Sequence, residues 1–212
     1  MQRGFVRSFA ASCRVRRVAS AVEYAATHPD ELWLFAYGSL MWAVPEGVHL
    51  MRREPATLHG YARSFCVYSR IYRGTAESPG LVLGLQPATG SSCDGVALQV
   101  HDLRSLQLLE AQEMAATGHP VPVYVRCAAD IHVHRDSRPR CALAFVANPD
   151  ASVPPEVSEN ERAATIASRS GARGPNREYL ENTAMQLEAM GVVDPAIVSL
   201  RARVSALLQD VT

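Results

Sequence analysis

Residues 32–42 of the chain read LWLFAYGSLMW. Six β-prone residues, LWLFAY, are followed at once by Gly38 and Ser39, where the apolar pattern stops. A short apolar run that ends at a turn former is typical of a strand. We therefore predict a strand over residues 32–37 and a sharp turn at Gly38, which can direct backbone N–H groups at an anion. A simple strand-to-loop turn is the alternative.

Further β-prone runs are separated by Gly and Pro, and they are GYARSFCVY from 60, LVLGLQ from 81, GVALQV from 95, VPVYVR from 121, DIHVH from 130 and CALAFVA from 141. One predicted helix interrupts them between 100 and 121, with Asp102 as its N-cap and Gly118 as its end. Six or seven strands in this arrangement indicate a small barrel or sheet.

The chain becomes helical after Asn148. Helices are predicted over 156–170 and 176–190, and a third opens at Asp194-Pro195, a favourable N-cap and first-turn pair. Strands first and helices later, with one inserted helix, favour an α+β fold.

Composition narrows the classes of function. The 212 residues are enough for one domain, and 21 basic residues balance 21 acidic ones. Without a net positive field we expect no nucleic-acid partner. The five cysteines include no C-x-x-C pair, which favours a reducing compartment over a disulfide framework. No apolar run approaches the ~18 residues of a membrane span, so we expect no membrane partner.

The N-terminus is basic, because residues 1–22 hold five arginines and no acidic residue precedes Glu23. On a helix, Phe5 and Phe9 would lie roughly opposite several of these arginines, a composition typical of a mitochondrial transit peptide. An ordinary N-terminal extension with solvated arginines is the alternative and is slightly favoured. We therefore predict an N-terminal extension over 1–30 and one domain over 31–212, with a cytoplasmic location and a mitochondrial one as the alternative.

Glu113 is the first candidate catalytic residue. At about 100° per residue it shares a helix face with Leu103, Leu106 and Leu109. Partial burial and the negative end of the helix dipole both disfavour the charged carboxylate, so we expect its pKa to be raised toward neutrality, as a general base requires. The alternative is a carboxylate at the edge of the core, neutralised by an arginine.

Other side chains give weaker signals. The turn-rich segment RGTAESPG, 73–80, can present Arg73 to a carboxylate in a bidentate fork, or it is a surface connection between strands. Ser39 lacks the G-x-S-x-G context of a nucleophile. His132 and His134 share one strand face, but no third ligand lies nearby in the sequence, so a solvated face is favoured over a metal site.

Several segments in order resemble the glutathione-specific ChaC-type γ-glutamylcyclotransferases, from about Leu32 to Leu207. They are LWLFAYGSLMW with its Y-G-S-L loop, GYARSFCV, RGTAESPGLVLGL, SSCDGVALQV, LLEAQEM with its Glu, and GARGPNREYLENTAMQLEAMGVVDP. The resemblance implies the γ-glutamylcyclotransferase-like fold, a small mixed β-barrel with helices packed around it. It also implies conversion of glutathione, the expected small-molecule partner, to 5-oxoproline and Cys-Gly without a cofactor.

The resemblance also implies roles for individual residues. The loop from Tyr37 to Leu40 would cradle the α-carboxylate of the γ-glutamyl unit, and Glu113 would be the base. Additional site members would be Arg73, Tyr179 and, as a further candidate, Arg63; the loop itself consists of Tyr37, Gly38, Ser39 and Leu40. No metal ligand is implied.

The chain departs from the family pattern at two places. Gln112 stands where the family usually carries Arg before its Glu, and Gly118-His119-Pro120 follows where the family tends to have a Tyr. A cyclotransferase for another γ-glutamyl compound, and a non-catalytic member that binds a γ-glutamyl ligand or a protein, therefore stay open as alternatives. The oligomeric state is not predicted.

Overall fold

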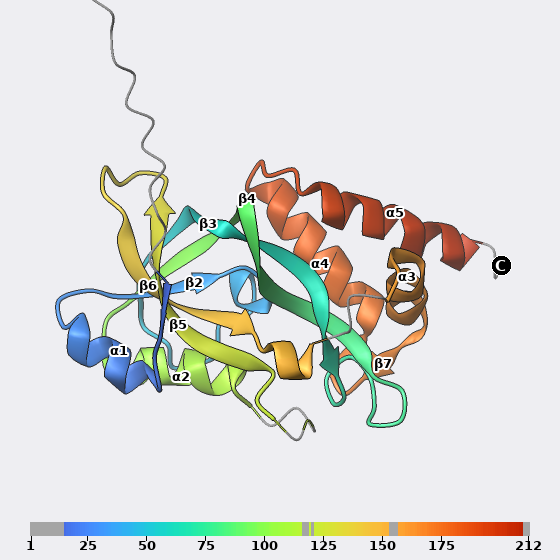
Figure 1. Cartoon of the computed structure of the whole chain (residues 1–212), viewed down its shortest axis with the longest axis horizontal. Coiled ribbons are helices and arrows are strands. Elements are labelled where there is room, and N and C mark those ends of the chain that lie inside the picture. Colours follow the sequence, from blue (N-terminus) through green and yellow to red (C-terminus); the bar gives the residue numbers. More distant parts are fainter. Residues whose placement is uncertain (1–14, 116–118, 120, 153–156, 210–212) are drawn as a thin grey trace, which may run out of the picture.

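The computed structural model describes residues 15–115, 119, 121–152 and 157–209 (Figure 1). Five strands form a ring in the order β5-β3-β4-β2-β6, and pairing of β6 with β5 closes it into a barrel. A sixth strand, β1, Val15–Arg17, pairs with β5 beside the short β3–β5 pairing. The barrel strands are β2, Leu32–Ala36, β3, Leu50–Ser69, β4, Gly80–Val100, β5, Tyr124–Val133, and β6, Arg140–Ala147.

The predicted α+β barrel is confirmed, but its strands are longer than the sequence pattern indicates. The runs at 81–86 and 95–100 belong to the single strand β4, and those at 121–126 and 130–134 are joined in β5. The antiparallel β3–β4 pair has a register shift between His59 and Tyr61. Such bulges bend and twist long strands, which allows them to curve around a barrel.

Helices lie at the two ends of the barrel in Figure 1. The helix α1, Ala21–Thr27, lies near α2, Leu103–Glu113, at one end, while α3, α4 and α5 gather at the other. These three are Glu159–Ser168, Asn176–Ala189 and Pro195–Gln209. Two 3-10 turns, η1, Ser39–Met41, and η2, Pro149–Ala151, and a small hairpin of β7, Ser170–Gly171, and β8, Gly174–Pro175, complete the fold.

Helix boundaries follow local capping chemistry. The predicted N-cap at Asp102 is confirmed, since its carboxylate accepts a hydrogen bond from Ser105 N at 2.7 Å. The predicted end of α2 at Gly118 is wrong, because the helix ends at Glu113 with Met114 as its C-cap; Gly118 itself lies outside the described residues. Asp194 caps α5 by accepting from Ala196 N at 3.1 Å.

Part of the predicted N-terminal extension packs on the domain. Ala21 and Tyr24 of α1 are fully buried, and the Tyr24 hydroxyl donates to the carbonyl oxygen of Cys141 at 2.8 Å. Residues 1–14 lie outside the described residues, so the transit peptide and the location in the cell stay predictions.

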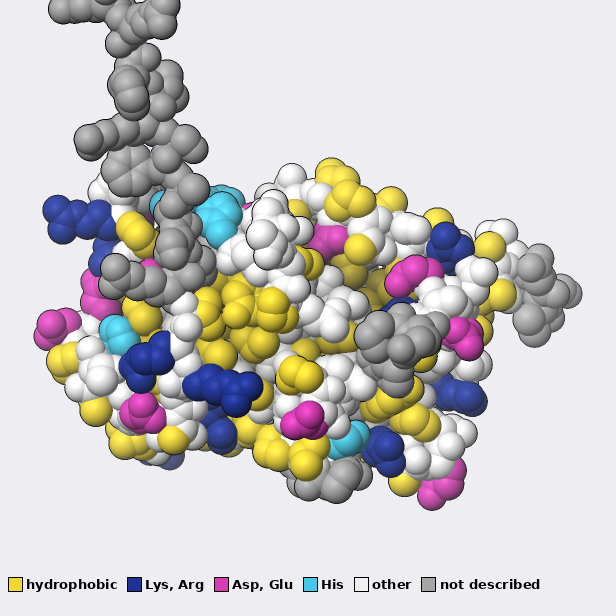
Figure 2. Space-filling model, viewed as in Figure 1, with side chains coloured by type: hydrophobic (Ala, Val, Ile, Leu, Met, Phe, Trp, Pro, Cys, Tyr) yellow, Lys and Arg dark blue, Asp and Glu magenta, His cyan; other side chains and the backbone are white. Residues whose placement is uncertain are grey.

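The core consists of large apolar side chains such as Leu34, Phe35, Leu58, Leu85 and Phe145, all almost fully buried. Basic and acidic side chains are both scattered over the face shown in Figure 2, with apolar groups between them. None of the helices in the described ranges is long and apolar enough to cross a membrane.

Candidate active site

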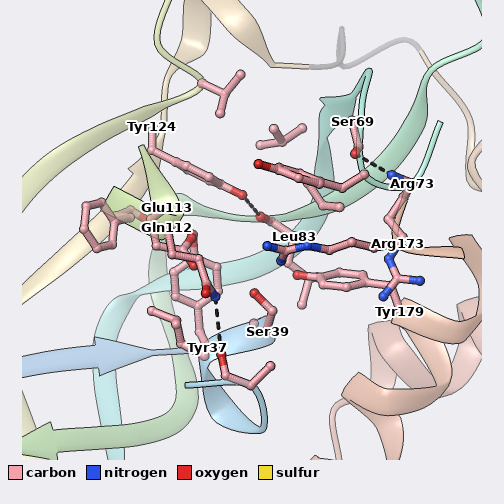
Figure 3. Close-up of a pocket in the computed structure, with 18 of the residues that line it drawn as sticks. Tyr37, Ser39, Ser69, Arg73, Leu83, Gln112, Glu113, Tyr124, Arg173 and Tyr179 are labelled. Atoms are coloured by element: carbon pink, nitrogen blue, oxygen red, sulfur yellow. Dashed lines mark hydrogen bonds between the residues drawn. The ribbon is translucent and has the colours of Figure 1, made fainter. Parts of the chain in front are cut away.

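A pocket of about 180 Å³ opens between the end of β2, the C-terminal end of α2 and the β7–β8 hairpin (Figure 3). Its wall is largely aromatic, with Trp42, five tyrosines and two phenylalanines among the lining residues. Four charged residues line it: Arg70, Arg73, Glu113 and Arg173. The pocket is therefore an apolar cavity with a single carboxylate and an excess of guanidinium groups.

Glu113 is the last residue of α2, and helix geometry turns its side chain from the core edge into this pocket. Its carboxylate has no hydrogen bond or salt bridge to any residue that the structure describes. Burial raises the pKa of Glu113 to about 7, and the Arg173 guanidinium opposes that rise. At neutral pH the group can therefore both accept and return a proton.

Tyrosines from three elements surround the carboxylate. Tyr37 donates to the carbonyl oxygen of Phe145 at 2.7 Å, and Tyr124 donates to that of Leu83 at 2.7 Å. Burial, followed by the nearby Glu113 charge, holds the pKa of Tyr179 above its usual range. The three hydroxyls stay protonated at neutral pH, so the carboxylate faces fixed dipoles in place of bulk water. Sequence reasoning missed Tyr124, which stands in an ordinary strand pattern without any distinguishing signal.

Glycine at position 38 is required for a steric reason, whereas the sequence suggested a conformational one. Its φ is −131°, outside the left-handed region that favours glycine. An ideal Cβ at this position would lie 2.9 Å from Tyr179 Oη. Ser39 and Leu40 then open the turn η1, whose first N–H groups precede its own hydrogen bonds, and both residues line the pocket. The loop thus places backbone donors close to the Tyr179 ring.

Arg73 lines the pocket, but its guanidinium is already engaged. Nη1 donates to the Pro175 carbonyl oxygen at 3.0 Å and lies 3.7 Å from a Glu178 carboxylate oxygen. The guanidinium also lies over the Tyr179 ring, 5.7 Å from its centroid. These contacts hold Arg73 against α4 and favour a role in shaping the wall.

The R-G-T segment needs glycine at position 74 because the two ends of its loop lie in contact. A Cβ on Gly74 would lie 2.1 Å from Gly80 N, so the two ends of the loop touch backbone to backbone. Asn176 seals the same region, because its side chain accepts from Leu81 N at 2.6 Å and donates to Leu81 O at 2.7 Å. The motif thereby fixes the start of β4 beside α4.

Arg63, the further candidate, does not line the pocket. Its buried guanidinium donates to the Tyr37 carbonyl oxygen at 2.9 Å and to the Asp94 carbonyl oxygen, and it lies 2.9 Å from an Asp194 carboxylate oxygen. Arg63 therefore ties the end of β2 to β4 and to the α5 cap. Its contribution to the site is to hold the backbone at the start of the Y-G-S-L loop through the Tyr37 carbonyl group.

Comparison with solved structures places the fold. The crystal structure of a yeast γ-glutamyl cyclotransferase specific to glutathione matches with a TM-score of 0.72 at 21% identity, covering 84% of this chain and 99% of that one. The model of the ChaC-like protein family matches residues 32–207. The chain belongs to the ChaC-like family.

Curated relatives agree with this membership. The Escherichia coli K12 glutathione-specific γ-glutamylcyclotransferase is 33% identical over 204 residues, which cover 92% of this ChaC-like chain and 83% of the relative. The human glutathione-specific γ-glutamylcyclotransferase 1 is 31% identical over 171 residues, covering 77% and 72% respectively. The region matched by the family model begins at the strand that opens the barrel.

In this ChaC-like protein the fold brings the predicted residues together in one pocket: Tyr37, Gly38, Ser39, Leu40, Arg73, Glu113 and Tyr179. Their individual roles stay predictions. The departure at Gln112 is visible, since its side chain lines the pocket and donates to the Ala43 carbonyl oxygen at 3.3 Å. His134 instead contacts Thr57 Oγ1 at 2.9 Å, away from the pocket, and within the described ranges no His, Cys, Asp and Glu cluster is suited to a metal.

Proposed function

We propose that this protein is a glutathione-specific γ-glutamylcyclotransferase that converts glutathione to 5-oxoproline and Cys-Gly, with Glu113 as the proton-transfer group. The observation that carries the proposal is the Glu113 carboxyl, unpaired among the described residues, in an aromatic pocket with a pKa raised to about 7. Family membership and the names of the curated relatives support the choice of substrate.

The reaction is an intramolecular transfer. Glu113 accepts a proton from the α-ammonium group, and the freed nitrogen attacks the γ-carbonyl carbon of the same glutamyl unit. The new C–N bond closes the five-membered lactam while the amide bond to the cysteinyl nitrogen breaks. The protonated Glu113 then delivers its proton to the departing nitrogen. The attacking nitrogen loses a second proton as it becomes the lactam N–H, and this proton also passes to the departing amine, which leaves as an ammonium group, so atoms and charge balance without a co-reactant.

Binding at the Y-G-S-L loop would make this ring closure efficient. Leu40 offers an N–H group at the start of η1, beside the Ser39 backbone group that hydrogen-bonds Tyr179, and the α-carboxylate of the glutamyl unit can accept a hydrogen bond there. Such anchoring holds the amine close to the γ-carbonyl carbon of the same glutamyl unit, and this proximity accelerates the ring closure. The enclosing tyrosine and tryptophan rings limit water around the reacting atoms.

The test is a direct assay of purified protein with glutathione, in which release of 5-oxoproline and Cys-Gly is followed by chromatography. The Glu113→Gln variant keeps the side-chain shape but removes the titrating group. We expect its rate of product release to be lower by a factor of about 100 or more. A matched control is Glu110→Gln, one turn earlier on α2, where the carboxylate is paired with Arg126. Equal product release by Glu113→Gln and the unmodified protein would contradict the proposal.

A further inference from the structure

The guanidinium of Arg173 lies at the pocket, where its charge acts on Glu113 without a hydrogen bond or salt bridge to that carboxylate. It forms no hydrogen bond or salt bridge to a side chain or backbone group in the part of the chain that the structure describes. Figure 3 shows its side chain reaching over the cavity toward Glu113, while the Arg73 side chain turns toward Tyr179. Arg73 is held by Pro175 and Glu178. The two arginines therefore differ, since Arg73 is engaged and Arg173 has donors available for a ligand.

The position of Arg173 is fixed before any ligand arrives. Its backbone N–H donates to the Tyr72 carbonyl oxygen at 2.9 Å, and the preceding Ala172 N–H donates to that of Ile71 at 2.8 Å. The guanidinium carbon lies 4.4 Å from the centroid of the Tyr72 ring, a cation–π arrangement. A group held at both backbone and tip loses little freedom when it binds an anion.

Close backbone packing keeps this hairpin in place. A Cβ on Gly171 would lie 2.6 Å from Gly74 N and 2.6 Å from Ile71 O. The β7–β8 hairpin that carries Arg173 therefore packs directly on the R-G-T segment. The mouth of the pocket is consequently built from two segments distant in sequence, one of which places a cation at the opening.

Glutathione has a second carboxylate that this cation can meet. If the Y-G-S-L loop holds the glutamyl α-carboxylate, the leaving Cys-Gly points away from it, and two residues extend up to ~7 Å beyond the reacting carbonyl. Arg173 is exposed at the mouth, where a departing peptide must leave. A planar guanidinium can bind a carboxylate through two parallel hydrogen bonds.

We propose that Arg173 is a specificity-determining residue that binds the C-terminal carboxylate of the leaving Cys-Gly peptide. This proposal rests on the proposed cyclotransferase function. It makes the substrate class a γ-glutamyl peptide with a free C-terminal carboxylate, and it disfavours γ-glutamyl amines and esterified peptides. The sequence analysis gave Arg173 no role beyond its place in the segment GARGPNREYL, and it expected Arg73 to bind a carboxylate.

The experiment compares glutathione with its glycyl monoethyl ester, in which a neutral ethyl ester replaces the terminal carboxylate. For the unmodified protein we expect kcat/KM to be about tenfold lower with the ester, mainly through KM, because a contact remote from the reacting atoms stabilises ground and transition states alike. In Arg173→Gln the two substrates become equal within about twofold. Arg173→Lys keeps part of the preference for glutathione because it keeps the charge without the fork.

Arg177→Gln is the matched control, since Arg177 is exposed on α4 and does not line the pocket, and it should keep the tenfold preference. If the unmodified protein releases 5-oxoproline from both substrates with equal efficiency, the proposed role of Arg173 is refuted, while the cyclotransferase function still stands. That role is also refuted if Arg173→Gln keeps the full preference for glutathione. Absence of 5-oxoproline from both substrates refutes the cyclotransferase function itself, so the two failures are distinguishable.

Discussion

The hydroxyl oxygen of Tyr179 occupies the space where a side chain at position 38 would begin, because an ideal Cβ on Gly38 lies only 2.9 Å from Tyr179 Oη. The ring cannot retreat easily, since it packs against Trp42 at 5.6 Å and Phe65 at 5.7 Å between centroids. The first pocket loop and α4 are thus in direct steric contact beside Glu113.

Gly38→Ala should therefore displace the Tyr179 hydroxyl and lower cyclotransferase activity at least about tenfold, with a destabilisation of about 1 to 3 kcal/mol from overpacking. Urea denaturation and the 5-oxoproline assay measure the two effects. In a Tyr179→Phe background the clashing oxygen is gone, so the added Ala should destabilise much less. An equal cost in both backgrounds would show that the contact is not the cause.

The activity should have an acid limb near pH 7. Glu113 works as a base only when it is ionised, and its pKa is raised to about 7 by burial, so kcat/KM should rise with pH up to that value and then level until other groups titrate. Arg173 opposes this rise in pKa, and Arg173→Gln should move the limb to higher pH. A limb near pH 4.5 in the unmodified protein would argue against a buried Glu113.

Glu113 should also make the fold less stable as pH rises. With a folded pKa of about 7 against an ordinary 4.5, the native state binds more protons than the unfolded chain between these values, so the free energy of unfolding falls through this window. Glu113→Gln removes the buried charge and should be more stable than the unmodified protein at pH 8 by roughly 1 to 3 kcal/mol. The two proteins should differ much less at pH 4.5.

Comparison of the two melting curves at pH 8 and at pH 4.5 tests this directly. Glu110→Gln offers the contrast, because its carboxylate is paired with Arg126 at 2.5 Å and accepts from Ala21 N at 3.0 Å. That change should destabilise the protein at pH 8. A Glu113→Gln variant that is less stable than the unmodified protein at pH 8 would mean that the carboxylate has a partner in solution.

Asn176 should be important for stability beyond its size. Its fully buried side chain satisfies both the N–H and the carbonyl group of Leu81, so Asn176→Ala leaves two buried backbone groups without partners. We expect a loss of about 2 to 4 kcal/mol in urea denaturation. Asn182→Ala, on the same helix and without a side-chain hydrogen bond among the described residues, should cost less than about 1 kcal/mol.

The sequence alone determined the fold class and the caps at Asp102 and Asp194, and it made Glu113 a candidate whose catalytic role stays a prediction. Hydrophobic periodicity, capping side chains and turn formers act within a few residues, so they can be read locally. The resemblance supplied the remaining pocket residues as a set. It could not distinguish Arg63 and Arg73, which are engaged with backbone and carboxylate groups, from Arg173, which has no such partner among the described residues.

Only the tertiary structure decided how the strands join and which groups face the cavity. Pro87 and Gly90 look like breaks in the sequence, yet β4 continues through them because pairing with β3 over most of its length outweighs local propensity. The requirement for glycine at position 38 likewise comes from Tyr179, which is distant in the chain. Contacts between distant segments depend on packing, and no local pattern encodes them.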